Sequence, residues 1–167
     1  QNSHTAKPIF YKIACVWGNH EGSMILWVNI MVIFSFLFFL FNYKFNKNYS
    51  LNTLLVQNIL ILGFLIFLIS NSNPFFKILP IPLEGLGLNP ILQDPALAIH
   101  PPLLYLGFVG SSIYFSAAMA AILSNSNGKN FASSIKVWVF ISWSFQSLGI
   151  IVGSIWAYYE LGLSLIH

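Results

Sequence analysis

The chain has 167 residues, of which 57% are hydrophobic and 7% charged, far below the roughly 25% of charged residues in a soluble domain. This composition excludes a soluble protein and indicates one that crosses a membrane. The net charge of +3 comes from scattered lysines without any arginine, too few for a nucleic-acid surface, and the single Cys15 excludes a disulfide framework.

Four apolar stretches are each long enough to cross a bilayer, which takes a helix of about 20 residues. They predict an all-α integral membrane protein with four transmembrane spans, at residues 23–42, 51–70, 103–123 and 135–158. We therefore divide the chain into an N-terminal segment on the outer face, residues 1–22, and a membrane domain, residues 23–167.

The first two spans carry polar residues whose surroundings can be predicted. Ser23 is the expected N-cap of the first span. Gln57 and Asn58 lie within the second span, and we expect both amides to face protein because an unpaired amide in lipid is costly. The connection that follows, residues 71–102, is rich in proline, and connections this long are usually functional.

The third and fourth spans carry small residues at helical spacing. Gly107 and Gly110 lie in the third span, and Gly149 and Gly153 lie in the fourth. Small side chains let a neighbouring helix approach closely, so we expect both sets to be packing faces.

Four spans place the N-terminal segment, the proline-rich connection and the C-terminus on one side of the membrane. The two short loops on the other side carry or adjoin four lysines and no acid, so the bias of positive charge places these loops in the matrix or cytoplasm. The lysines are Lys44, Lys47, Lys129 and Lys136.

The end of the proline-rich connection holds the most unusual chemistry. Pro101 and Pro102 fit the first turn of a helix, which predicts a helix start near Leu103. His100 then lies just outside that helix, with its backbone extended by the following proline. The positive end of the helix disfavours imidazolium, and a neutral imidazole can ligate a metal.

Other roles for these residues stay open from the sequence alone. His100 could instead hydrogen-bond a neighbouring carbonyl as a structural residue. His20 is a second, weaker candidate ligand that could equally cap the first span, and Glu21 or Asp94 could orient a histidine. No paired-carboxylate, Ser-His-Asp or Cys-His pattern is visible, and four histidines without acid clusters make a poor zinc site.

Three stretches of the sequence carry a family resemblance. Residues 17–27 (Trp-Gly-Asn-His-Glu-Gly-Ser-Met-Ile-Leu-Trp), residues 88–105, which include His100-Pro-Pro, and residues 148–162 occur in the same order in the CcmF/NrfE haem lyase family of cytochrome c maturation, which this chain resembles. The match covers almost the whole chain.

This resemblance implies a haem-handling membrane protein. Its expected partners are the haem chaperone CcmE, apocytochrome c with its thiol-reducing partner, and membrane lipid, with no nucleic acid. His100 matches one of two outer-face histidines that flank a tryptophan-rich haem platform in the family. The resemblance therefore makes His100 the candidate axial ligand of a b-type haem shared with a partner chain, and it assigns no catalytic residue.

The resemblance also has a gap. In the family, the Tyr-Tyr-Glu-Leu-Gly stretch leads into the tryptophan-rich platform, whereas here Leu163 to His167 follow. We expect the N-terminal part of a split haem lyase that is inactive alone, with other CcmF fragments carrying the platform. The alternative is a non-catalytic structural subunit of a larger respiratory-chain or assembly complex.

The composition adds an expectation about location. The chain is rich in Phe, Ile, Asn and Lys, which is typical of AT-rich and often organellar genomes. We therefore expect the mitochondrial inner membrane, with the bacterial plasma membrane as the alternative.

Overall fold

Helices form every regular element in the part of the chain that the structure, a computed structural model, describes. The described residues are 3–43, 46–76, 80, 83–85, 87, 93–124 and 128–162, with the backbone alone for 128–130 and 161. Four helical segments within them are long and apolar enough to cross a membrane: His20–Asn42, Lys47–Asn71, Pro95–Leu123 and Phe131–Glu160. The prediction of an all-α protein with four spans is confirmed.

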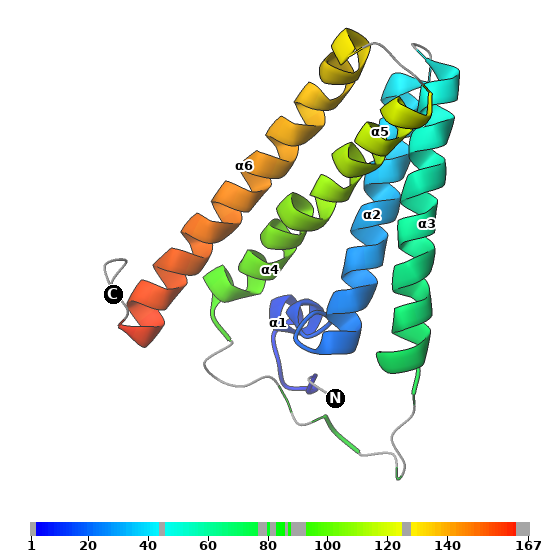
Figure 1. Cartoon of the computed structure of the whole chain (residues 1–167). Helices are drawn as coiled ribbons and strands as arrows, with labels where there is room; N and C mark the ends of the chain where they lie inside the picture. The colour runs from blue at the N-terminus through cyan, green and yellow to red at the C-terminus, as the bar shows by residue number, and fades with distance from the viewer. Residues whose placement is uncertain are drawn as a thin grey trace.

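The helices pack as a tilted bundle (Figure 1). The short α1 (Ile9–Ala14) precedes α2 (His20–Asn42), which lies beside α3 (Lys47–Asn71). The third span consists of α4 (Pro95–Phe108), the 3-10 turn η2 (Val109–Ser111) and α5 (Ser112–Leu123). The last helix, α6 (Gly128–Leu161), runs back along α4, and the end of α3 lies at the same end of the bundle as α1 and the start of α4.

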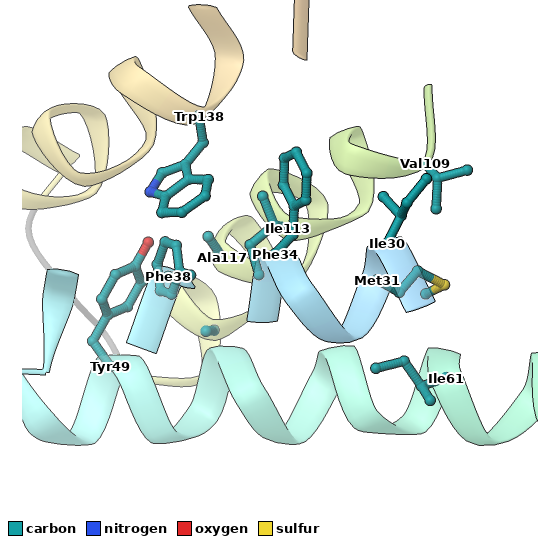
Figure 2. Packing of buried hydrophobic residues seen from close by; sticks show 11 residues of the cluster. Ile30, Met31, Phe34, Phe38, Tyr49, Ile61, Val109, Ile113, Ala117 and Trp138 are labelled. Carbon is teal, nitrogen blue, oxygen red and sulfur yellow. The ribbon is translucent and has the colours of Figure 1, made fainter. Parts of the chain in front are cut away.

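The core lies where α2, α3, α5 and α6 meet (Figure 2). The indole of Trp138 on α6 points toward Phe34 and Phe38 of α2, with ring centroids 5.8 and 5.7 Å away. Phe38 and Ile113 are completely buried. These large side chains fix α6 against α2 at the end of the bundle away from α1.

A buried amide joins α3 to α5. Gln57 is completely buried; its Nε2 donates to Ser112 Oγ at 2.7 Å, and Ser116 Oγ donates to its Oε1 at 2.6 Å. The prediction that Gln57 faces protein is confirmed. The same prediction is wrong for Asn58, which is exposed because the next residue along a helix points about 100° away.

Glycines set the close approach of α4 and α6. A Cβ added at Gly107 would lie 2.5 Å from the backbone nitrogen of Gln146, and one at Gly149 would lie 3.0 Å from that of Leu104. No larger residue fits at Gly107 without separating the helices. The predicted packing faces of the third and fourth spans are therefore confirmed, and they face each other.

Several helix boundaries differ from the predicted ones. The last helix, α6, runs from Gly128 to Leu161 and so extends beyond the predicted 135–158 at both ends. α2 begins at His20 with Asn19 as its N-cap, and Ser23 lies inside the helix. α3 begins at Lys47, before the predicted start at residue 51. The largest difference is α4, which begins at Pro95 and not near Leu103, so the end of the predicted 71–102 connection is helical. In the rest of that connection, residues 77–79, 81–82, 86 and 88–92 lie outside the described residues.

The early start of α4 has a local cause. Asp94 has an extended backbone, and its carboxylate accepts a hydrogen bond from the Leu97 N–H at 3.0 Å. Pro95 follows at the first helical position, where its missing N–H costs nothing. Asp94 is thus a helix cap, and the expectation that it orients a histidine is not supported by its contacts.

Candidate ligand site around His100

His100 lies in the second turn of α4, and Pro101 and Pro102 follow it inside the same helix. The prediction that His100 lies outside a helix start is wrong. The argument for a neutral imidazole from the helix dipole also fails, because that effect is confined to the first turn. Proline has no N–H to donate four residues back, so Pro102 leaves the carbonyl of Ala98 without its helical partner.

Trp17 supplies the missing donor. Its indole Nε1–H donates to the Ala98 carbonyl oxygen at 3.1 Å, and Ala98 is buried. The turn before α2 and the His-Pro-Pro segment, far apart in sequence, therefore meet in a direct hydrogen bond. This contact brings two of the three stretches singled out in the sequence to one place.

The imidazole of His100 lies on the backbone of α6, the third of those stretches. Its Nδ1 is 2.7 Å from the carbonyl oxygen of Gly149. A Cβ on Gly153 would lie 2.4 Å from the Cε1 of the ring, so only glycine leaves room for the imidazole there. The three stretches thus converge on the residues around one histidine.

The hydrogen-bond partner of Nδ1 determines which nitrogen of the neutral ring carries the proton. A carbonyl oxygen can only accept, so Nδ1 carries the proton and Nε2 keeps its lone pair. Among the described residues, Nε2 has no hydrogen-bond partner. The ring therefore combines the structural contact that the sequence left open as an alternative with a nitrogen that can ligate a metal.

The surroundings show which kind of metal this nitrogen could serve. The described residues contain no group of three or more His, Cys, Asp or Glu side chains that could hold a metal ion. One imidazole suffices only for a metal that arrives with most of its ligands, as iron does in a porphyrin. On α6, the Nε1 of Trp156, three residues after Gly153, is buried and has no hydrogen-bond partner among the described residues. His100 is therefore the residue of this site that could hold such a metal.

His20 is placed differently. It is the first residue of α2, and its Nδ1 lies 2.5 Å from the Oγ of Ser72, the buried residue that ends α3. Its ring also meets the edge of Phe67, with centroids 6.2 Å apart. His20 therefore joins the start of α2 to the end of α3, whereas the side chain of His100 contacts α6.

The N-terminal segment is tied to the long connection at the same end of the bundle. Thr5 donates its hydroxyl to Glu84 Oε1 at 2.7 Å and its backbone N–H to Oε2 at 3.3 Å. These two hydrogen bonds to the carboxylate hold the pKa of Glu84 below its ordinary value. Lys12 Nζ donates to the carbonyl oxygen of Thr5 at 2.8 Å and holds the same segment against α1.

Sequence reasoning found His100 but missed Trp17, which donates to the segment of α4 that carries it. Trp17 belongs to one of the singled-out stretches, yet nothing in its spacing indicates that it donates to a residue 81 positions away. A local signal did exist. Any proline inside a helix leaves a carbonyl without its donor, which invites a search for a donor elsewhere.

Comparison with known proteins shows what the sequence is similar to. A family model described as cytochrome c assembly protein matches residues 17–165. The cytochrome c-type biogenesis protein CycK of Rhizobium meliloti is 49% identical over 97% of this chain and 24% of its own length. CcmF of Escherichia coli and NrfE of Haemophilus influenzae are 44% and 42% identical over 96% of this chain and 25% of theirs. No solved structure matches. The chain spans about a quarter of the length of these relatives.

Proposed function

This chain belongs to the cytochrome c assembly protein family, and on that premise we propose that it is a subunit of a cytochrome c haem lyase. In this role it helps to hold haem for covalent attachment to apocytochrome c. Its relatives CycK, CcmF and NrfE are cytochrome c-type biogenesis proteins. Because the chain spans about a quarter of their length, the rest of the machinery, on the same or a second polypeptide, would supply the tryptophan-rich haem platform.

The observation that carries this proposal is the Nε2 of His100, which has no hydrogen-bond partner among the described residues. The Gly149 carbonyl fixes the proton on Nδ1, which leaves the Nε2 lone pair for the iron of a b-type haem shared with the partner segment. Haem supplies the groups that become thioethers with the apocytochrome cysteines. His20 stays a second candidate ligand, and its Nε2 is the nitrogen it could offer, since Ser72 engages its Nδ1.

The proposed partners follow from this role. Haem would be delivered by the haem chaperone CcmE, and the acceptor would be apocytochrome c, kept reduced by a thiol-reducing partner. The rest of the contact surface would be covered by membrane lipid and by the CcmF segment that carries the platform.

The chain is a multi-pass membrane protein by the length and apolarity of its four spans. We place it in the mitochondrial inner membrane, on the strength of a composition rich in Phe, Ile, Asn and Lys. The bacterial plasma membrane is the alternative, because the named relatives come from bacteria. Fractionation of the source cells with an antibody against this chain separates the two.

A structural role is the competing function. A purely structural histidine could make the same hydrogen bond to Gly149. The glycines between α4 and α6 also show that these two helices pack closely here. On that alternative, the chain is a non-catalytic membrane subunit of a larger respiratory or assembly complex.

The substitution His100→Asn separates the two roles. The asparagine amide can still donate to the Gly149 carbonyl, because its nitrogen reaches the position of Nδ1, but it offers no nitrogen lone pair to iron. We expect cells carrying His100→Asn to keep normal amounts of this protein and to lose mature c-type cytochromes. His100→Ala removes both functions and serves as the reference. Normal cytochrome levels with His100→Asn would rule out the ligand role and favour the structural subunit.

A further inference from the structure

We propose that Trp17 is a positioning residue for His100. Its indole N–H replaces the backbone N–H that Pro102 lacks, and it thereby fixes the turn of α4 from which the imidazole projects. This inference rests on the proposed role of His100 and adds to it a residue that never touches the ligand.

The first step concerns the carbonyl of Ala98. Two consecutive prolines remove two rungs from the helical hydrogen-bond ladder directly after His100, and such gaps are where helices kink. The Ala98 carbonyl is buried, and a buried carbonyl without a donor is strongly disfavoured. An indole nitrogen can only donate, so the 3.1 Å contact with Trp17 is a hydrogen bond to this carbonyl.

The second step concerns how Trp17 is held. Ser23 Oγ donates to the carbonyl oxygen of Trp17 at 2.9 Å, and the side chain of Asn19 accepts from the N–H of Gly22 at 2.9 Å. A Cβ on Gly22 would lie only 1.5 Å from the carbonyl oxygen of Val16, so the chain folds back on itself too closely for any other residue. The polar residues of this turn thus hold the backbone from which the indole reaches α4.

The third step connects the carbonyl to the imidazole. Ala98 is two residues before His100, so the indole holds α4 within the turn that bears the ring. On the opposite side, Nδ1 of the ring donates to the Gly149 carbonyl, and the ring occupies the space that a side chain at Gly153 would fill. The 2.7 Å bond from Nδ1 persists only while both sides are fixed, and this bond decides which nitrogen keeps its lone pair. Trp17 therefore controls the tautomer of His100 without touching it.

The test reads the tautomer directly and needs no haem. The full chain is labelled with ¹⁵N-histidine, reconstituted in lipid nanodiscs and studied by NMR at about pH 8.5, where an ordinary histidine is neutral. The chain has four histidines, and the signal of His100 is the one that disappears in His100→Asn. In the wild type, we expect His100 to be protonated on Nδ1.

Two substitutions probe Trp17. Trp17→Phe keeps an aromatic ring and removes only the donor, and we expect the other tautomer of His100 to become more populated, at least about fivefold, as loss of one net hydrogen bond would give. Trp27→Phe is the matched control: Trp27 packs on α4 through Tyr105 and Phe108, and no hydrogen bond of its indole is seen among the described residues. We expect it to leave the tautomer unchanged.

The decisive variant restores the missing donor by another route. Pro102→Ala returns a backbone N–H to the Ala98 carbonyl, so the double variant Trp17→Phe/Pro102→Ala should recover the wild-type tautomer, and should fold even where Trp17→Phe alone does not. An unchanged tautomer in Trp17→Phe, or no recovery in the double variant, overturns the proposal.

Measurement of c-type cytochromes in the same strains distinguishes failure of the positioning role of Trp17 from failure of the ligand role of His100. A changed tautomer with normal cytochrome levels in both Trp17→Phe and His100→Asn supports the positioning role of Trp17 and overturns the ligand role of His100. An unchanged tautomer in Trp17→Phe together with lost cytochromes in His100→Asn overturns the positioning role of Trp17 and supports the ligand role of His100.

Discussion

A single methyl group at Gly153 should break the site around His100. The Cβ of an alanine there would lie 2.4 Å from Cε1, 2.6 Å from Nδ1 and 3.2 Å from Nε2 of the imidazole. Optimal contacts between such atoms are about 3.5–4.0 Å, so the ring must move by about 1 Å. A shift of that size cannot preserve the 2.7 Å bond from Nδ1 to the Gly149 carbonyl.

The expected loss of stability combines three contributions. Overpacking of a close contact costs about 1–3 kcal/mol, and the lost hydrogen bond costs about 1 kcal/mol. Replacing a helical glycine by alanine returns about 0.5–1 kcal/mol. We therefore expect Gly153→Ala to lower the free energy of unfolding by about 1–3 kcal/mol.

The assay is reversible unfolding of the purified chain in mixed micelles, followed by the near-ultraviolet circular dichroism of its tryptophans. Gly63→Ala on α3 is the matched control, because its Cβ would meet nothing within 4 Å. We expect that control to be unchanged or more stable by up to about 1 kcal/mol. Equal stabilities for the two variants would refute the close packing of His100 on α6.

Three further predictions concern other contacts. Ser116→Ala leaves the buried Oε1 of Gln57 without its donor and should cost about 0.6–2 kcal/mol in the same unfolding assay, whereas no loss would mean that water or lipid replaces the hydroxyl. Asn19→Ala removes the cap of α2 and should cost about 0.5–2 kcal/mol, with Asn19→Ser largely restoring it. Because the pKa of Glu84 is lowered in the folded chain, its hydrogen bonds from Thr5 stabilise the N-terminal segment at neutral pH. This stabilisation is lost as the pH falls through the folded-state pKa and the carboxylate is protonated. The protection factor of the Thr5 amide against hydrogen exchange should fall over that acidic range in the wild type and should be lower in Glu84→Gln at neutral pH; a constant protection factor in the wild type would contradict the tether.

The transmembrane architecture could be predicted from the sequence because it depends on local properties. Four long apolar stretches specify four spans, and glycines at helical spacing indicate where helices approach. The prediction from this spacing is confirmed for Gly107 of α4, which lies against α6, and for Gly149 of α6, which lies against α4. Gln57 was predictable for the same reason: a buried amide needs partners, and two serines provide them.

The site itself depends on contacts that the sequence does not show. The two prolines after His100 favoured a helix start near residue 103, but the Asp94-Pro95 pair is the stronger start signal. The helix continues past the prolines because Trp17 donates to the Ala98 carbonyl, which Pro102 leaves without a backbone donor. The proton position on His100 likewise depends on the Gly149 carbonyl, 49 residues away. Pairings at such separations arise only from the packed fold.

The most direct measurement is the optical spectrum of the membrane complex purified through this chain, compared between the wild type and His100→Asn at equal protein amounts. If the imidazole ligates haem iron, the wild type should show the absorption of a histidine-ligated haem, and the variant should lose that signature. Identical haem spectra from both complexes would contradict the account, because the one lone pair on which it depends would then be dispensable.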